Sequence, residues 1–442
     1  MDEQFSIEQP AFDSSRGVAA FGYRLGDLRF VETLTFPAGF DPTVASAPSF
    51  SRLLGLTAMV LGVSYFKLKA PLVITTPLAL TERERELVLD VYENGLGEFY
   101  ARNALKRFGR IVLEAGAAAD DAVEAPRLVD RVLLPIGGGK DSLVSLQLLE
   151  AAGVDLTPFA VNPKGPILGS VDKIGRVPIY VARRLDPEMI RLGKLPGYYN
   201  GHVPSTAINS MIAALTALLF SYRRIVLSNE RSASEGNVAF DGREANHQHS
   251  KSMAFERLIA EALAAATGGA LGYFSLLRPY SEARIAALFA RQTRFDRVFS
   301  SCNENFKLAG HDGPLWCGRC PKCHFVFLIL APVMDKARLI EIFGQNLLDQ
   351  ARHERSFREL TGLAGQKPWE CVGEIEEAAA CLYTLTSRPE WADAAIVSRL
   401  RSDLLAQFGA PRLEAALAEL NHDATEHLIP DDIVQRVAPH AL

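Results

Sequence analysis

The sequence predicts an α/β fold in which a parallel sheet carries helices on both faces. An N-terminal α+β module at residues 1–127 precedes it, and a C-terminal helical region at residues 333–442 follows it. Three observations lead to this prediction. An apolar run at 132–136 is followed by three glycines and a helical pattern, strand and helix patterns alternate from 131 to 299, and only helical periodicity follows residue 332. The domain expected to carry the site is therefore residues 128–332.

The N-terminal module combines a hairpin with helices. Apolar alternation predicts two strands within 18–36 that meet at a turn, and residues 50–65 have a helical pattern. Thr81 and Glu84 have the spacing of a capping box, which predicts a helix beginning there. Short strands are expected at 72–76 and 111–114. Residues 1–15 are expected to be irregular, and 115–127 to form a linker.

The middle domain is expected to alternate strands with helices. The apolar runs that predict strands lie at 132–136, 157–161, 177–181, 225–228, 274–277 and 297–299, and helical patterns lie at 187–194, 206–222, 252–266 and 282–290. In such sheets, ligands bind beyond the carboxyl ends of the strands. The segments 137–142, 162–165 and 229–232 are therefore expected to converge.

Composition and charge exclude several classes of protein. The net charge of −5 argues against a nucleic-acid substrate, and the acidic start lacks the layout of a signal peptide. The longest apolar stretches noted, 211–220 and 325–333, are too short to span a bilayer. We therefore expect a cytoplasmic protein with no nucleic-acid or membrane partner, and leave its oligomeric state open. The last third shows no catalytic spacing and is expected to be a helical cap, with Cys371 and Cys381 as ordinary core residues.

The glycine-rich loop predicts a phosphate site. Free amide N–H groups at the start of a helix favour anions. The loop is not the P-loop of NTPases, because Asp141 follows Lys140 where Ser or Thr is required, and Ser142 stands where a dinucleotide fingerprint needs glycine. It resembles instead the Ser-Gly-Gly-x-Asp-Ser loop of the PP-loop ATP pyrophosphatases, with glycine in place of the leading serine. The residues concerned are Gly137, Gly138, Gly139, Lys140, Asp141 and Ser142.

That resemblance implies ATP and Mg²⁺ as cofactors. PP-loop enzymes cleave ATP between the α and β phosphates, adenylating a substrate and releasing pyrophosphate. The loop amides and Ser142 are expected to hold the pyrophosphate, with Lys140 adding charge, and Asp141 is expected to orient the loop or to meet Mg²⁺ through water. Asn162 and Lys164 follow the second strand, where such folds often place the nucleoside.

Four cysteines have the spacing of a metal site. Cys317, Cys320 and Cys323 form a Cys-x2-Cys-x2-Cys turn, and Cys302 upstream is the candidate fourth ligand. Structural Zn²⁺ is favoured, and an iron–sulfur cluster is the alternative. If Cys302 points elsewhere, the substitute ligands are His311 and His324.

The order of loop and cysteine turn is similar to that in 7-cyano-7-deazaguanine synthases over residues 130–332. A longer resemblance covers the whole chain, to the family of UDP-N-acetylmuramoyl-L-alanyl-L-glutamate epimerases. It is carried by residues 134–142 and by Phe21-Gly-Tyr-Arg24, Leu227-Ser-Asn-Glu-Arg-Ser-Ala233, Asn246-His-Gln-His-Ser-Lys-Ser252 and Trp316-Cys-Gly-Arg-Cys-Pro-Lys-Cys-His324. The resemblance implies ATP-dependent inversion of the terminal glutamate of a UDP-N-acetylmuramoyl-dipeptide, with release of AMP and pyrophosphate.

Such a reaction needs a base at the glutamate α-carbon. The catalytic candidates are Asp141, His247 and His249, since a histidine near its ordinary pKa suits proton transfer at neutral pH. Hydrogen bonding to substrate or capping of the next helix remains the alternative for the two histidines, and His202 is a further candidate base. The remaining polar candidates for contacts with substrate or metal are Glu230, Arg231, Glu235, Arg243 and Lys251.

Three other functions remain open at this point. A PP-loop synthase of the 7-cyano-7-deazaguanine type would form an amide or nitrile and require ammonia. A tRNA-thiolating enzyme would carry sulfur or a cluster on its cysteines, against which the acidic composition argues. A nucleotide sensor would bind ATP without releasing pyrophosphate.

Overall fold

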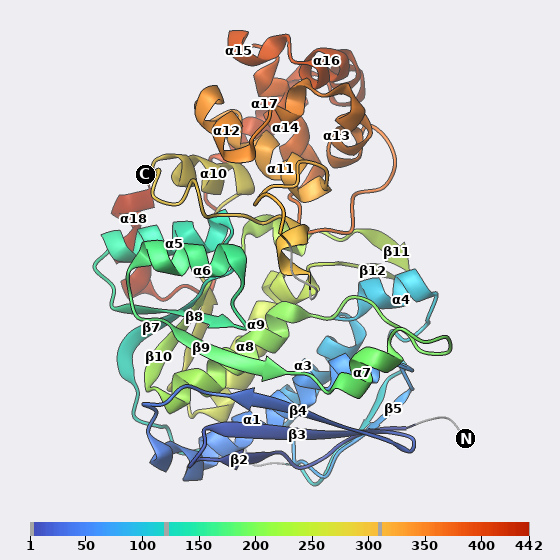
Figure 1. The fold of residues 1–442 in the computed structure, drawn as a ribbon, viewed down its shortest axis with the longest axis vertical. Coiled ribbons are helices and arrows are strands. Elements are labelled where there is room, and N and C mark those ends of the chain that lie inside the picture. Colours follow the sequence, from blue (N-terminus) through green and yellow to red (C-terminus); the bar gives the residue numbers. More distant parts are fainter. Residues whose placement is uncertain (1–3, 119–122, 308–311, 442) are drawn as a thin grey trace.

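Eleven strands form one mixed sheet in the computed structural model, which describes residues 4–118, 123–307 and 312–441. The order along the main path is β13-β10-β7-β8-β9-β4-β3-β1-β5-β6, and β2 pairs with β3 (Figure 1). The strands are β1 (Phe5–Ile7), β2 (Ala11–Asp13), β3 (Val18–Leu25), β4 (Leu28–Thr35), β5 (Val73–Thr75), β6 (Val112–Glu114), β7 (Val129–Pro135), β8 (Leu156–Val161), β9 (Ile179–Arg184), β10 (Tyr222–Leu227) and β13 (Gly272–Ser275). The predicted α/β fold class is confirmed.

Strands β7, β8, β9, β10 and β13 pair in parallel. Ile225 of β10 lies opposite Leu133 of β7, and Pro135 lies opposite Phe159 of β8. Along the chain, the sheet grows from β7 to β9 in one direction and then from β10 to β13 in the other. The strand order therefore reverses between β7 and β10, where open sheets of this type place their ligands.

The N-terminal strands extend this sheet across an antiparallel junction between β4 and β9. Arg183 at the junction donates to the buried carboxylate of Glu32 over 2.6 Å and to the Ser64 hydroxyl over 2.9 Å. The proposed boundary at residue 127 thus lies within a continuous sheet, and the division into domains stays a prediction. The expectation that residues 1–15 are irregular is wrong, because Phe5 and Ile7 alternate into the core and add β1 to β3.

Ten helices precede the cysteine turn in the described part of the chain, and the core beneath them falls into two clusters. One cluster joins α1, α8 and α9 to the N-terminal strands, and the other joins α5 and α10 to the C-terminal helices. Thr81 begins α3 with the predicted capping box. The helices are α1 (Pro48–Leu61), α2 (Val63–Phe66), α3 (Glu82–Glu93), α4 (Gly97–Asn103), α5 (Lys140–Ala151), α6 (Gly165–Ile174), α7 (Pro187–Leu192), α8 (Ser205–Leu219), α9 (Met253–Ala266) and α10 (Glu282–Ala290).

The run from α1 to α2 is the one helical stretch in the described chain that is long and apolar enough to cross a membrane. It is longer than the apolar stretches noted from the sequence. However, 89% of its apolar window is buried inside the protein, as in a core helix.

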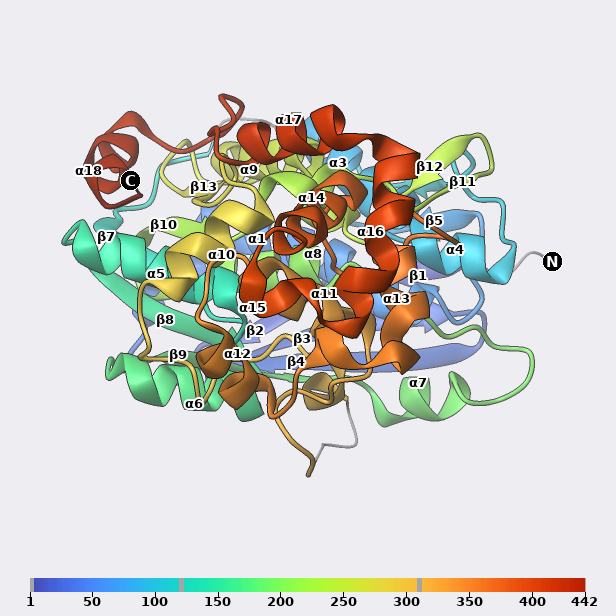
Figure 2. The same ribbon diagram turned by 90° about the horizontal axis from the view of Figure 1, so that it is seen from above.

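The C-terminal helices form a lobe beyond one end of the sheet, as Figures 1 and 2 show. They are α11 (Pro321–Leu330), α12 (Lys336–Phe343), α13 (Glu354–Leu360), α14 (Ile375–Leu385), α15 (Pro389–Ala392), α16 (Ala395–Phe408), α17 (Ala410–Leu420) and α18 (Asp431–Ala441). The last helix returns beside α5, where Arg436 donates to the Gly153 carbonyl over 2.8 Å.

Several element predictions need correction. Residues 297–299 form no strand, because the chain turns here: the amide of Phe299 donates to the Phe295 carbonyl, and both side chains are buried. The helix expected to reach 222 ends at Leu219, and Tyr222 already pairs in β10. The hairpin of β11 (Val238–Phe240) and β12 (Arg243–Ala245) was not predicted, and neither were α4 and α6.

Candidate active site

A cavity of about 260 Å³ lies at the point where the strand order reverses. Its walls come from the ends of β7 and β10, the start of α5, the start of α8 and the cysteine turn. Its polar and glycine lining includes Gly137, Gly139, Asp141, Ser142, Asn209, Asn229, Ser300, Ser301, Asn303 and Lys322. Segments 137–142 and 229–232 therefore meet as expected. Segment 162–165 does not contribute to this lining.

The glycine loop presents backbone to the cavity. Gly138 has a φ of +78°, and a Cβ there would lie 2.8 Å from the backbone of Pro166. A Cβ on Gly139 would lie 2.7 Å from the Ser301 hydroxyl oxygen, whereas Gly137 faces open space. The Ser142 hydroxyl lies 3.3 Å from the Gly137 nitrogen and accepts from it, which holds the loop closed. The amides at the start of α5 are thus aimed at a site that suits an anion.

Lys140 points into the protein rather than into the open cavity. It is buried and forms ion pairs with Asp141 and Glu282. Burial by itself would lower the pKa of Lys140, but these two carboxylates raise it. Burial also raises the pKa of Glu282 to about 8, against the attraction of Lys140. Lys140 is therefore a buried cation beneath the loop, and Asp141 links it to the cavity.

Asn162 lies outside the cavity lining. Its side-chain nitrogen donates to the Arg183 carbonyl over 2.7 Å, and its side-chain oxygen accepts from the Arg183 amide over 2.9 Å. Its φ is +46°, a backbone conformation that asparagine tolerates better than most residues. Lys164 donates to the Lys307 carbonyl over 3.2 Å. Both side chains thus contact the backbone of other segments.

The four predicted cysteine ligands converge. Their sulfur atoms all lie within 4.8 Å of one another, with 3.5 Å between Cys320 and Cys323, 3.7 Å between Cys317 and Cys323, and 4.0 Å between Cys302 and Cys320. Ligands of a tetrahedral zinc ion at about 2.3 Å lie about 3.8 Å apart. An iron–sulfur cluster spreads its thiolates over several iron atoms and needs them farther apart. The donor set therefore fits one zinc ion.

Of the two substitute histidines, only His324 lies in the described part of the chain, and it does not belong to this set. His324 is buried, and its Nδ1 lies 2.7 Å from the Ser356 hydroxyl. His311 lies outside the described residues.

The cysteine turn also builds one wall of the cavity. The amide of Ser300 donates to the Gly138 carbonyl over 2.9 Å, and the Ser300 hydroxyl accepts from the Cys302 amide over 3.1 Å. At the other end of the turn, Lys322 lines the same cavity. A metal held by the cysteines would therefore fix the wall that faces the glycine loop.

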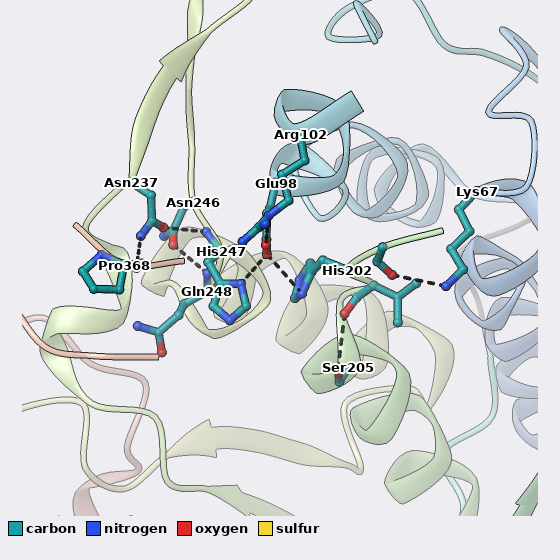
Figure 3. A network of polar contacts seen from close by, with 12 residues as sticks. Lys67, Glu98, Arg102, His202, Ser205, Asn237, Asn246, His247, Gln248 and Pro368 are labelled. Atoms are coloured by element: carbon teal, nitrogen blue, oxygen red, sulfur yellow. Dashed lines mark hydrogen bonds and ion pairs between the residues drawn. The ribbon is translucent and has the colours of Figure 1, made fainter. Parts of the chain in front are cut away.

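The two candidate histidines have separate surroundings. His247 contacts the Glu98 carboxylate of α4 through its Nδ1, and the same carboxylate oxygen lies 3.5 Å from Nδ1 of His202 (Figure 3). The two imidazole rings are 4.6 Å apart. His249 instead pairs its Nε2 with Asp90 of α3 over 2.7 Å. Neither histidine is among the residues that line the cavity.

Cys371 lies in a loop rather than in a helix. It lies in the loop between α13 and α14 and is half-buried. The expectation that Cys371 is ordinary core is wrong, whereas Cys381 is buried in α14 as expected. Gly362, Gly365, Pro368 and Gly373 all break helical structure, and their density was the signal for a loop here.

The loop that carries Cys371 is held by contacts from three other parts of the chain. Glu370 accepts from the Lys322 amide over 3.1 Å, and the Pro368 carbonyl accepts from Asn237 over 3.1 Å. Arg102 of α4 lies over the Trp369 ring, 5.7 Å from its centroid. The C-terminal lobe thereby reaches the site rather than only covering it.

The remaining polar candidates already have protein partners. Glu235 pairs with Lys367, Arg231 donates to the His422 carbonyl over 3.3 Å, and Arg243 lies 3.1 Å from the Glu93 carboxylate. The Lys251 ammonium donates to the Gln248 side chain over 3.2 Å. Glu230 is buried, and its carbonyl accepts from Arg278 over 2.8 Å.

Comparison with known proteins gives two family matches. Residues 1–276 match the MurL N-terminal domain, and residues 298–413 match the MurL C-terminal domain. Three similar curated proteins are all named UDP-N-acetyl-alpha-D-muramoyl-L-alanyl-L-glutamate epimerase. The protein from Xanthomonas oryzae pv. oryzae is 41% identical over 438 residues, covering 98% of this chain and 96% of its own. The protein from Micromonospora sp. is 42% identical, and the match covers 90% of this chain and 90% of that protein. The protein from Salinispora tropica is 41% identical, and the match covers 90% of this chain and 88% of that protein.

Proposed function

The chain belongs to the MurL family, and from that premise we propose that it inverts the terminal L-glutamate of UDP-N-acetylmuramoyl-L-alanyl-L-glutamate. The relatives that carry this name match almost the full length of the chain, so the C-terminal lobe belongs to the shared protein. We further propose that the reaction consumes ATP, releases AMP and pyrophosphate, and takes place in the cytoplasm.

The observation that carries the ATP dependence is the cavity at the start of α5. Its floor is the glycine loop at the point where the strand order reverses, and amide N–H groups there favour phosphate. The loop sequence resembles that of the PP-loop ATP pyrophosphatases. Gly137 lacks the hydroxyl of that motif, but Ser301 places a hydroxyl against the neighbouring Gly139.

Adenylation solves a chemical problem of the inversion. Removing the α-proton beside a free carboxylate creates a dianion, whereas an acyl-adenylate has lost that carboxylate charge and has a more acidic α-carbon. After inversion, hydrolysis returns the carboxylate and releases AMP. Mg²⁺ bound with ATP would neutralise the leaving pyrophosphate, and Asp141 is the carboxylate of the loop that lines the cavity.

The cysteine site has a structural role in this proposal. Zinc held by four thiolates has no open position for substrate. It would fix Ser300, Ser301 and Lys322 against the glycine loop.

The test is an incubation of purified protein with ATP, Mg²⁺ and the UDP-linked dipeptide. We expect D-glutamate to appear in the product together with AMP and pyrophosphate. The alternative, a synthase of the 7-cyano-7-deazaguanine type, would require ammonia and ignore the dipeptide. Inversion without ATP, or AMP formation that does not depend on the dipeptide, would contradict the proposal.

A further inference from the structure

A second group of metal-ligand side chains converges in the protein, apart from the four cysteines. Glu98, His202 and His247 each bring one ligand atom to within 4.8 Å of the others. Nδ1 of His202 lies 3.5 Å from a carboxylate oxygen of Glu98, and Nδ1 of His247 is hydrogen-bonded to the same oxygen. Figure 3 shows both imidazoles directed at this carboxylate, and their ring centroids are 4.6 Å apart. Two imidazole nitrogens and one carboxylate oxygen thus face a common point.

The three side chains come from three segments that only the fold brings together. Glu98 lies in the first turn of α4, His202 precedes α8, and His247 follows β12. The residue before His202 is Gly201, and a Cβ there would lie 3.0 Å from the ring of Phe99 in α4. The absence of a side chain on Gly201 therefore lets the segment with His202 pack directly against the helix that carries Glu98.

Polar contacts outside the group hold each of these segments in place. Arg102 donates to the second carboxylate oxygen of Glu98 over 2.6 Å, so that the first oxygen remains for the histidines. The backbone amide of His247 donates to the side chain of Asn237 over 2.8 Å. The Lys67 ammonium donates to the carbonyl of Gly201 over 3.2 Å. Partners of this kind orient metal ligands in proteins and raise the affinity for the metal.

The spacing of the three ligand atoms fits a small divalent ion. Nitrogen and oxygen ligands lie about 2.0–2.2 Å from zinc, which places tetrahedral neighbours about 3.3–3.5 Å apart. The separation of 3.5 Å between His202 and Glu98 agrees with this value. An ion between His247 and Glu98 would replace their hydrogen bond. Imidazole nitrogens suit Zn²⁺ and the other first-row transition ions, whereas Mg²⁺ and Ca²⁺ prefer oxygen ligands alone.

The group differs from the cysteine site in leaving one tetrahedral position to solvent. The His202 and His247 side chains are 18% and 17% exposed, so an ion could enter from water, while Glu98 is buried. Three protein ligands with an open fourth position are typical of zinc sites that exchange water or bind an oxygen of a ligand. Four thiolates close a site instead.

We propose that Glu98, His202 and His247 form a second metal site, which binds one Zn²⁺ or a similar first-row divalent ion and keeps a fourth position for water. This inference does not depend on the proposed function, because it concerns an ion bound by the protein alone. The site shares no residue with the cysteine site. The alternative is a histidine–glutamate cluster held by hydrogen bonds, which would take up no ion.

The test is a titration of the full chain with Zn²⁺ in the presence of a chromophoric chelator. The protein as isolated is expected to carry its zinc at the cysteines, because a closed four-thiolate site releases the ion less readily than three ligands do. It should then bind one further equivalent at micromolar Zn²⁺. His202→Ala and His247→Ala should each weaken this second equivalent by more than about 100-fold. Arg102→Leu should weaken it by about 10–100-fold, because it removes only a partner of the carboxylate.

His249→Ala is the matched control. The His249 side chain is 18% exposed and pairs with Asp90, so it resembles the two ligands but lies outside the group. This variant should bind the second equivalent like the unaltered protein. Glu98→Gln keeps the shape of the side chain and can still hydrogen-bond to the histidines, but a neutral amide is a poor ligand for Zn²⁺. Added Zn²⁺ should therefore raise the unfolding temperature of the unaltered protein and of His249→Ala, but not that of Glu98→Gln.

Co²⁺ as a probe reports which ligands hold the second ion. Bound at this site, Co²⁺ should absorb in the visible range without a thiolate charge-transfer band, because no cysteine belongs to the group. A thiolate band from the second equivalent would overturn the inference. So would an unaltered protein that binds no second equivalent, or one whose second equivalent persists in His202→Ala and His247→Ala. Equal losses in His249→Ala and His247→Ala would also contradict it.

Discussion

Gly138 is the position where the glycine loop tolerates no side chain, and its replacement by alanine tests the loop directly. Its φ of +78° is a left-handed conformation that costs other residues about 1–2 kcal/mol. In addition, the new Cβ would lie 2.8 Å from the backbone of Pro166 and 2.9 Å from the nitrogen of Ile167. Moving this backbone aside costs about 1–3 kcal/mol. Together these contributions predict that Gly138→Ala lowers the free energy of unfolding by about 2–5 kcal/mol.

Gly137→Ala is the matched control. Gly137 has no positive φ, and nothing lies within 4 Å of its Cβ position. The free energy of unfolding of this variant should lie within about 0.5 kcal/mol of that of the unaltered protein. The assay is urea unfolding combined with AMP formation. If the Gly138 variant relaxes instead of unfolding, the same cost should appear as a higher KM for ATP. Equal stability and equal KM in both variants would refute this account of the loop.

Three further outcomes follow from buried groups. Burial raises the pKa of Glu377 to about 7, so the native protein holds a proton that the unfolded chain releases above about pH 4.5. The stabilising contribution of this proton is complete below pH 4.5 and is lost as the pH rises through 7, which lowers the free energy of unfolding by about 3 kcal/mol. Glu377→Gln should flatten this fall when stability is measured by urea unfolding. Cys320→Ser should lose the roughly one equivalent of zinc expected per chain and unfold at a lower temperature, whereas bound iron in the unaltered protein would contradict the zinc assignment. Glu256→Ala should lower the free energy of unfolding by about 3–5 kcal/mol, because it leaves the buried Arg278 without its partner carboxylate. The exposed pair of Arg297 and Glu341 is the comparison, and Glu341→Ala should change stability by less than about 1 kcal/mol.

The parts of the fold that could be predicted carry strong local signals. The apolar run at 132–136, the three glycines and the helix after them appear in the structure as β7, the loop and α5. The capping box at Thr81 begins α3, and the cysteine spacing places four sulfurs together. Such signals lie within a few residues of one another and need no knowledge of the tertiary structure.

The pairing of distant segments could not be predicted in the same way. Nothing near β4 shows that it pairs with β9, or that β1 joins the same sheet. The histidine cluster has the same property, because Glu98 lies more than a hundred residues before both His202 and His247 in the chain. Their types became informative only when the fold brought them together. The prediction for Cys371 fails for the same reason, because the fold places this residue in a loop between α13 and α14.

Histidine roles were equally dependent on the fold. The sequence offered His247 and His249 as equivalent members of one polar stretch, but the backbone turns between them. One ring meets Glu98 and the other meets Asp90. The spacing of two residues could not distinguish these surroundings.

The most direct test of the account is the fate of oxygen atoms in the glutamate carboxylate. The UDP-linked dipeptide is prepared with ¹⁸O in the α-carboxylate of its terminal L-glutamate and incubated with the protein, ATP and Mg²⁺. If that carboxylate is adenylated and the acyl-adenylate is hydrolysed at the acyl carbon, the AMP released carries one ¹⁸O for each inverted glutamate. Inverted product with AMP that contains no ¹⁸O would contradict the account.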